Sequence, residues 1–239
     1  MYILNQVLEK ILFLDVETAC VAETFEELPE RMQELWVKKS YKFQNAEKNL
    51  DPVELYFEKA GIQAEFGKII CISVGYLILE EGKMMLKTKS YYGHDEYSLL
   101  VEFAEVINHF YAKDPTIKKI CTHNGKEFDI PYICRRMLVN RVPLPKTFDI
   151  AGKKSWNIDF ILDTQEMWKF GDMKATTSLD LLAAIFGIAS PKDDIDGSQV
   201  SHVYWKEHDL ERIKTYCEKD VLTTAQVFLA LNQLPLVKD

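Results

Sequence analysis

The sequence predicts a mixed α/β sheet with helices on both of its faces. Strand-like and helix-like segments alternate along the 239 residues. Residues 68–79 and 83–92 are both strand-like and are separated by a Glu-Glu-Gly turn, which predicts an antiparallel hairpin. The later strand-like segments are separated by helices, which predicts parallel crossover connections. Helices are then needed to cover the apolar faces of the sheet.

Strands are predicted where short apolar runs, rich in β-branched residues, lie between polar or turn-forming residues. The first run, Ile11 to Thr18, has the composition of a buried strand. In chain order, the strand candidates are 11–18, 68–79, 83–92, 118–122 and 157–162.

Helices are predicted by apolar residues at helical spacing and by residues typical of helix ends. One segment begins with Asp51-Pro52 and ends at Gly61, and another follows Ser178 and is closed by Gly187. The helix candidates are about 26–42, 51–61, 98–111, 130–139, 178–186 and 209–231.

The charged, mainly helical segment 19–67 is predicted to be an insertion after the first strand. One apolar stripe of this segment comprises Leu28, Met32, Leu35 and Trp36. The stripe is most simply a docking face, and a substrate-facing role for Trp36 or the nearby lysines is the alternative. A polar loop is expected at 190–198. No repeat or linker is evident, so residues 1–239 are predicted to form one domain.

The composition is that of an ordinary soluble protein, with 47% hydrophobic and 28% charged residues. No apolar run approaches the roughly 20 residues needed to cross a bilayer. The first residues lack the features of a signal peptide, so a cytoplasmic location is expected. The five cysteines form no CxxC pair, which argues against a disulfide framework or a structural zinc site.

The net charge of -8 argues against a protein that coats nucleic acid by bulk electrostatics. An enzyme that grips a few nucleotides is compatible with this charge, because acids gathered in a metal site add to the negative total. Basic residues do cluster locally, and each cluster alone is more typical of a solvated face than of a phosphate track. The clusters are Lys38, Lys39 and Lys42; Arg135, Arg136 and Arg141; and Lys153 and Lys154.

Two acids, Asp15 and Glu17, lie near the end of the first predicted strand. Residues two apart on a strand point to the same face, so these carboxylates lie side by side while Leu14 and Val16 face the opposite, packed side. Burying two unpaired carboxylates is costly, and a divalent cation with oxygen ligands is a natural remedy. Taken alone, the sequence of this strand is explained about equally well by a metal site and by a strand end with both acids in solvent.

A third acid, Asp129, follows the predicted strand 118–122 through the turn sequence Asn124-Gly125. Asp129 lies two residues before Pro131 and, taken alone, is best explained as a helix N-cap. Such a cap would also hold its carboxylate at the edge of the sheet, where ligand sites of open α/β folds occur.

The last predicted helix carries a phenol and a carboxylate on one face. Tyr216 and Asp220 are four residues apart, and residues at this spacing are neighbours on a helix surface. Taken alone, they are most simply a boundary tyrosine and a solvated aspartate.

Together these motifs resemble the DEDD superfamily of 3'-5' exonucleases, in its tyrosine-bearing (DEDDy) branch. The nearest likeness is to the exonuclease domain of family B DNA polymerases and to stand-alone bacterial proteins related to it. The resemblance spans about residues 11–231, and the segment 19–67 departs from the polymerase domains. The motifs that carry it are Asp15 to Thr18 (DVET), Asn124 to Asp129 (NGKEFD) and Tyr216 to Asp220 (YCEKD), supported by Ser178 to Leu182 (SLDLL) and Asp196 to Val200 (DGSQV).

The resemblance implies a ribonuclease H-like fold, a five-stranded mixed sheet with the first strand central. It also implies a site for two Mg²⁺ or Mn²⁺ ions. Two such ions about 3.5–4 Å apart serve both the entering and the leaving oxygen of a phosphoryl displacement. Tyr216 would orient the attacking water, since a phenol with a pKa around 10 is a poor base at neutral pH. The implied metal ligands are Asp15, Glu17, Asp129 and Asp220.

By the same resemblance, Thr18 and Asn124 approach the terminal nucleotide. Phe128 packs beneath the site or against a base, and packing is favoured; His123 is expected to be a loop residue and not the base. The activity implied is hydrolysis of single-stranded DNA from its 3' end to nucleoside 5'-monophosphates. The alternatives are a 3'-5' exonuclease of RNA, which would contact the 2'-hydroxyl, and a non-catalytic nucleic-acid-binding module of the same fold.

Overall fold

A computed structural model describes residues 8–43, 51–80, 83–113, 117–172, 174–189 and 194–237. Five strands of this part form one sheet in the order β3-β2-β1-β4-β5. The central strand β1 pairs antiparallel with β2 and parallel with β4, which confirms the predicted mixed sheet. The strands are β1 (Ile11–Cys20), β2 (Gly67–Glu80), β3 (Lys83–Tyr92), β4 (Lys119–Thr122) and β5 (Ile161–Asp163).

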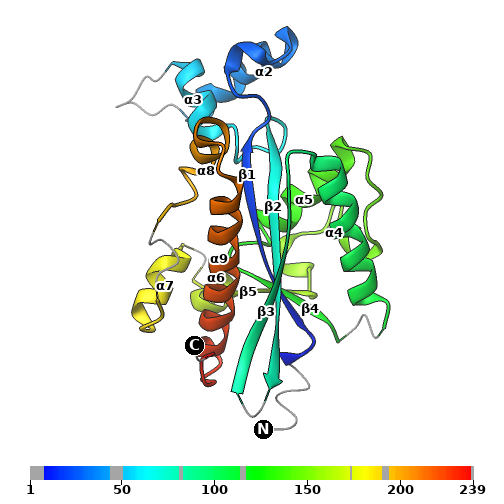
Figure 1. Cartoon of the computed structure of the whole chain (residues 1–239), viewed down its shortest axis with the longest axis vertical. Helices are drawn as coiled ribbons and strands as arrows, with labels where there is room; N and C mark the ends of the chain where they lie inside the picture. The colour runs from blue at the N-terminus through cyan, green and yellow to red at the C-terminus, as the bar shows by residue number, and fades with distance from the viewer. Residues whose placement is uncertain are drawn as a thin grey trace.

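Helices cover both faces of the sheet, as predicted (Figure 1). None of the helices in the described ranges is both long and apolar enough to cross a membrane. The α-helices are α2 (Glu30–Ser40), α3 (Pro52–Lys59), α4 (Glu96–Tyr111), α5 (Asp129–Val139), α6 (Thr164–Lys169), α7 (Leu179–Ile185), α8 (Val200–His202) and α9 (Leu210–Leu231).

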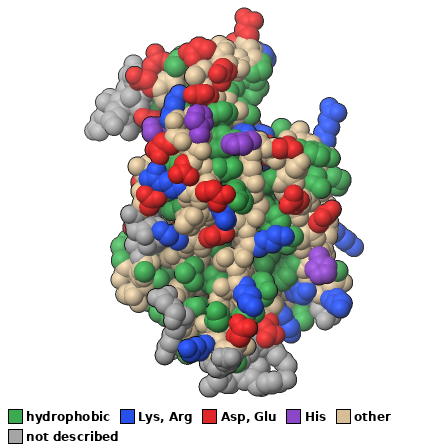
Figure 2. All heavy atoms as spheres, viewed as in Figure 1, with side chains coloured by type: hydrophobic (Ala, Val, Ile, Leu, Met, Phe, Trp, Pro, Cys, Tyr) green, Lys and Arg blue, Asp and Glu red, His purple; other side chains and the backbone are tan. Residues whose placement is uncertain are grey.

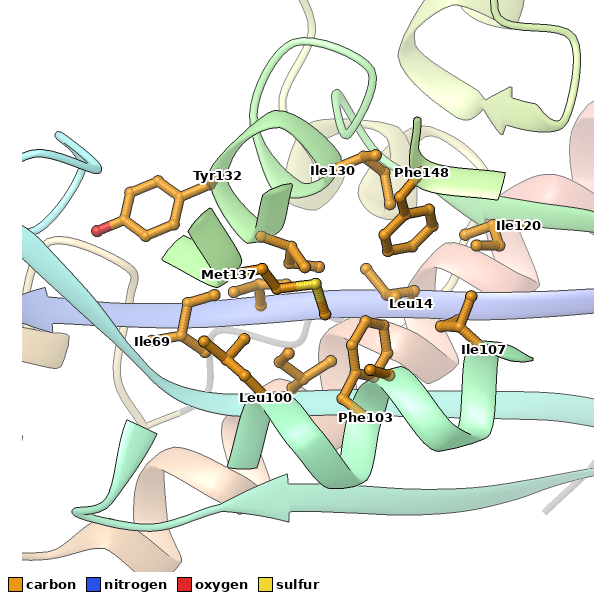
Figure 3. Close-up of a cluster of buried hydrophobic side chains, with 14 of the residues drawn as sticks. Leu14, Ile69, Leu100, Phe103, Ile107, Ile120, Ile130, Tyr132, Met137 and Phe148 are labelled. Carbon is orange, nitrogen blue, oxygen red and sulfur yellow. The ribbon is translucent and has the colours of Figure 1, made fainter. Parts of the chain in front are cut away.

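Strand β1 is apolar along most of its length because helices pack on both of its sides. Leu14 and Val16 belong to the cluster that packs against α4 and α5, where Figure 3 shows Leu14 among Phe103, Met137 and other buried side chains. Phe13 belongs to a second cluster, formed with α9, on the opposite face. The prediction that successive side chains of this strand point to opposite faces of the sheet is confirmed.

The insertion forms its own small core at one end of the sheet, with α2 and α3 at the top of Figure 1. Trp36 is 0% exposed; its Nε1 donates to the Pro52 carbonyl at 2.7 Å, and its ring centroid lies 5.1 Å from that of Phe66. The docking interpretation of this stripe is therefore confirmed, and the substrate-facing alternative for Trp36 is wrong. Leu35 lies outside the packed stripe, since its side chain is exposed.

Several predicted boundaries shift for local reasons. The segment 26–42 is interrupted at Pro29, and α2 starts directly after that residue because proline cannot occupy a helix interior. Strand β1 continues to Cys20, so the insertion begins two residues later than predicted. Strand β5 is short and is followed by α6, which the sequence analysis did not predict. Residues 190–193 of the predicted loop lie outside the described residues.

A buried ion pair fixes α5 against α4 and β2. Arg136 donates from Nη2 to Glu96 Oε2 at 2.6 Å and from Nε to Glu96 Oε1 at 2.9 Å. Glu96 Oε1 also accepts the Ile69 backbone N–H at 2.7 Å. The prediction that Arg136 belongs to a solvated basic face is therefore wrong, because this guanidinium is buried and fully engaged. The pair anchors the helix that carries Asp129 as its first residue.

Candidate active site

Asp15 and Glu17 lie side by side on the face of β1 that packs against α9. Oxygen atoms of both carboxylates and the sulfur of Cys217 lie within 4.8 Å of one another. The Cys217 thiol on α9 also donates to the Asp15 backbone carbonyl at 3.5 Å. The predicted shared face is confirmed, and Glu17 is a buried residue and not part of a solvated strand end.

Asp129 reaches the site as the first residue of α5, directly after the loop that follows β4. Asn124 adopts a left-handed conformation with a φ of 64°, and a Cβ at Gly125 would lie 2.4 Å from Thr122 Oγ1, so the turn needs glycine there. The helix begins at Asp129, with Phe128 in the N-cap position. The N-cap prediction for Asp129 is therefore wrong by one residue: Asp129 is the first residue of the helix, and its buried carboxylate lies near the other acids.

Tyr216 and Asp220 complete the group from α9. Both side chains are buried, so the interpretation as a boundary tyrosine and a solvated aspartate is wrong. Asp220 raises the pKa values of both Glu17 and Asp129 by charge repulsion, which places its carboxylate close to theirs. Three elements separated in sequence therefore bring the four carboxylates near enough to repel one another.

Burial and mutual repulsion disfavour ionisation of these acids. Burial is the main cause that raises the pKa of Asp15 to about 7, and repulsion by Asp129 adds to it. Burial also raises the pKa of Asp129 to about 7, although backbone N–H groups partly oppose this. The pKa of Glu17 is raised well above its usual value by burial and by Asp15. Ionising these acids together is therefore unfavourable.

The donor set fits divalent cations such as Mg²⁺ and Mn²⁺, which prefer carboxylate oxygens. Asp15 Oδ2 is buried and has no hydrogen-bond partner among the described residues. Burial raises the pKa of the Cys217 thiol well above its usual value, so this thiol stays neutral and is a poor ligand for such ions.

A cleft of about 230 Å³ opens over the carboxylates. Thr18, Asn124 and Phe128 line it, so the structure brings all three predicted substrate contacts to the site. The lining residues are Asp15, Val16, Glu17, Thr18, Ile62, His123, Asn124, Phe128, Asp129, Gly197 and Tyr216. Ile62 comes from the insertion, and sequence reasoning missed it.

Contacts within the protein fix the Phe128 and His123 side chains that line the cleft. The Phe128 ring packs against the core and lies 5.4 Å from the Tyr132 ring, as the favoured prediction had it. His123 Nδ1 hydrogen bonds with Thr164 Oγ1 at 2.9 Å, and Nε2 with the Thr177 carbonyl at 3.0 Å. Both ring nitrogens of His123 are thus engaged, which fits its prediction as a loop residue.

Asp163, which sequence reasoning missed, holds the turn that leads to Asp129. Its Oδ1 accepts the Asn124 N–H at 2.9 Å, and its Oδ2 accepts the Lys126 N–H at 3.1 Å. The same carboxylate caps α6 through the N–H groups of Gln165 and Glu166. The available signal was an acid directly after the predicted strand 157–162, which by itself is typical of a helix cap and does not point to a turn elsewhere in the chain.

Comparisons with known proteins agree with this geometry. A family model described as "Predicted 3'-5' exonuclease related to the exonuclease domain of PolB" matches residues 61–235, a range that contains Asp129, Tyr216 and Asp220 but begins after Asp15 and Glu17. No curated protein matches the chain significantly.

Among solved structures, the chain is similar to the family B DNA polymerase from the hyperthermophilic archaeon Pyrobaculum calidifontis. The TM-score is 0.52 at 15% sequence identity, over 92% of this chain and 24% of the polymerase chain. The likeness shows a ribonuclease H-like fold, and the chain spans about a quarter of the polymerase. Because the family model covers most of the sequence, this protein belongs to the family of predicted 3'-5' exonucleases related to the exonuclease domain of PolB.

Proposed function

We propose that this protein is a metal-dependent 3'-5' exonuclease that hydrolyses the terminal phosphodiester bond of single-stranded DNA and releases nucleoside 5'-monophosphates. The observation that carries the proposal is the convergence of four carboxylates from β1, α5 and α9 beside one cleft. Their raised pKa values indicate a cluster that is incomplete without positive charge.

Asp15, Glu17, Asp129 and Asp220 would hold two Mg²⁺ or Mn²⁺ ions. When bound, such ions lower the pKa of a coordinated water and stabilise the oxygen that leaves the phosphorus. The four carboxylates offer four negative charges, which two divalent ions balance.

Tyr216 would orient the attacking water. Burial, together with the nearby Glu17 and Asp220, raises the pKa of this phenol far above neutral pH, so the hydroxyl keeps its proton. A neutral hydroxyl both donates and accepts hydrogen bonds, which suits it to hold a water in line with the scissile bond. Tyr216 is therefore proposed as an orienting group and not as the general base.

Thr18, Asn124 and Phe128 would position the terminal nucleotide, since all three line the cleft beside the acids. The Phe128 ring is half-buried, so it supplies an apolar wall while staying fixed to the core. The left-handed backbone of Asn124 turns the chain at this point and brings its side chain to the same cleft.

The test is digestion of a 5'-labelled single-stranded DNA with Mg²⁺ or Mn²⁺, followed by analysis of the products. Stepwise shortening with release of nucleoside 5'-monophosphates is expected. Asp15→Ala and Asp220→Ala should abolish it, whereas Asp159→Ala, at an exposed position, should not. Normal cleavage by both active-site variants would overturn the proposal. A parallel digestion of RNA decides between the two sugars, and absence of cleavage of both would favour a non-catalytic binding module.

A further inference from the structure

A second pocket borders the turn that leads to Asp129, through Lys126. Its volume is about 300 Å³, and it lies between α5 and the segment 144–158. The floor is apolar and includes Leu144, Phe148 and Ile158. The charged residues of its lining are all basic, namely Lys126, Arg135 and Lys153.

This basic lining is unusual in a chain whose net charge is -8. Arg135 and Lys153 are exposed and form no ion pair within the described ranges. Lys126 Nζ forms an ion pair with Glu166 Oε2 at 2.7 Å. Arg135 lies near enough to Glu65 to lower the pKa of the Glu65 carboxyl group. Two of the basic clusters seen in the sequence thus meet at one pocket, and two of its three cations are available to an anion.

An exposed aromatic side chain lies next to the basic lining. Trp156 follows Ser155 of the pocket and is 63% exposed, and Lys154 Nζ lies 4.9 Å from the centroid of its ring. Leu138 on α5, which also lines the pocket, is equally exposed. Aromatic and apolar surfaces beside exposed cations are the combination that binds single-stranded nucleic acid, because bases stack while phosphates are neutralised.

The pocket and the acidic cleft share a single turn of chain. Asn124 and Phe128 line the cleft, whereas Lys126 and Pro131 line the pocket. A strand with its 3' end at the carboxylates can therefore pass over this turn and reach the pocket with nucleotides further from the end. The volume of the pocket is suited to one nucleotide and not to a folded partner.

We propose that this pocket is a subsite for a nucleotide upstream of the scissile bond. Arg135 and Lys153 bind the backbone phosphate, and the base stacks on Trp156 beside the apolar floor. The inference rests on the proposed exonuclease function, because it assigns the pocket to the same strand. It predicts that the enzyme needs several nucleotides for tight binding and not only the terminal one.

The experiment compares a substrate that occupies only the cleft with substrates long enough to occupy the pocket as well. The p-nitrophenyl ester of thymidine 5'-monophosphate occupies the cleft alone, whereas 5'-labelled DNA single strands of increasing length also occupy the pocket. The variants are the double variant Arg135→Ala with Lys153→Ala, and Trp156→Ala beside the conservative Trp156→Phe. The matched control is Lys83→Ala with Lys87→Ala, at exposed positions of β3, on the opposite edge of the sheet from β5.

For the double variant, KM for the longer strands should rise about tenfold or more with kcat little changed, while the nitrophenyl ester is cleaved at the wild-type rate. The dependence of log binding constant on log salt concentration should become shallower by about 0.7 for each phosphate contact removed. Trp156→Ala should also raise KM, and Trp156→Phe should restore it. If the double variant has the same KM for the longer strands as the β3 control, the subsite is refuted.

A binding measurement separates failure of the pocket from failure of the proposed function. Anisotropy of a fluorescein-labelled single strand is recorded without divalent ions, so no cleavage interferes. Weaker binding by the double variant supports the subsite, whatever the cleavage assay shows. If the wild type cleaves neither substrate, only the proposed exonuclease activity is refuted. Equal binding by wild type, double variant and control refutes the subsite, even if the wild type cleaves both substrates.

Discussion

Asp129→Asn is expected to stabilise the metal-free protein while it abolishes activity. The wild-type carboxylate is buried beside Asp163 and Asp220, and its pKa is raised to about 7 from the usual 3.8. Above neutral pH the folded state therefore contains an ionised carboxylate that is more favourable in the unfolded chain. An asparagine of the same shape removes this charge without opening a cavity.

The size of the effect follows from the pKa difference of about three units. Each unit corresponds to about 1.4 kcal/mol, which sets a ceiling of about 4 kcal/mol on the stabilisation at pH 8. The new amide is also buried and loses the hydrogen bonds that a carboxylate accepts, so a gain of roughly half, about 2 kcal/mol, is expected. For a domain of this size that corresponds to a rise in Tm of about 4–8 °C.

The pH dependence has a definite sign. Between about pH 4 and pH 7 the folded state keeps a proton on Asp129 that the unfolded chain has released. The free energy of unfolding of the metal-free wild type therefore falls as the pH rises through this window and levels off above it. Asp129→Asn lacks this contribution, so its advantage over wild type should be present at pH 8 and absent at pH 4.

Thermal unfolding followed by circular dichroism, at pH 4 and pH 8 in EDTA and at pH 8 in Mn²⁺, checks these expectations. Asp159→Asn, at an exposed position, is the matched control. In Mn²⁺ the order should reverse, because the wild type gains stability from bound ions and the variant lacks a ligand. A Tm for Asp129→Asn in EDTA at pH 8 that is no higher than that of the control would refute the reasoning.

Three further substitutions test the structure around the site and the proposed orienting role of Tyr216. Glu96→Ala leaves Arg136 buried without its partner and should lower the free energy of unfolding by about 3–5 kcal/mol, measured by urea denaturation. Tyr216→Phe should lower kcat roughly 10- to 100-fold with little change in KM, as measured by steady-state digestion of single strands. Asp163→Ala should cost about 2 kcal/mol of stability, followed by urea denaturation, and should also lower kcat, because the turn before Asp129 loses its anchor.

The sequence predicts the acidic site well where local geometry decides the outcome. Side-chain alternation alone brings Asp15 and Glu17 to one face of β1, and helical spacing alone brings Tyr216 and Asp220 to one face of α9. Whether these faces are buried depends on α9 packing across β1 and β2, which no local pattern reveals. For that reason the solvated interpretation of Asp220 was the better one when its helix was taken alone, and only the three motifs together favoured a shared site.

The residues that sequence reasoning missed or misplaced depend on long-range contacts. Asp163 acts on a turn 39 residues away, where it accepts the Asn124 N–H, and its own strand β5 is too short to show a period. Arg136 looks like part of a charged surface run, yet its partner Glu96 lies 40 residues earlier on α4. Such pairings follow from the fold and not from spacing in the sequence.

The position of the cleft follows from the order of the strands. Strands β1 and β4 are parallel and adjacent, so their carboxyl ends meet at the same edge of the sheet. Glu17 lies near the end of β1, beside a break in its pairing with β2, and Asp129 follows the end of β4 through a turn that Asp163 fixes. Helix α9 then adds its carboxylate from the neighbouring face. Because the turn before Asp129 also borders the basic pocket, one short segment positions a metal ligand and, by our proposal, the path of the incoming strand, so a change in this turn should affect catalysis and binding together.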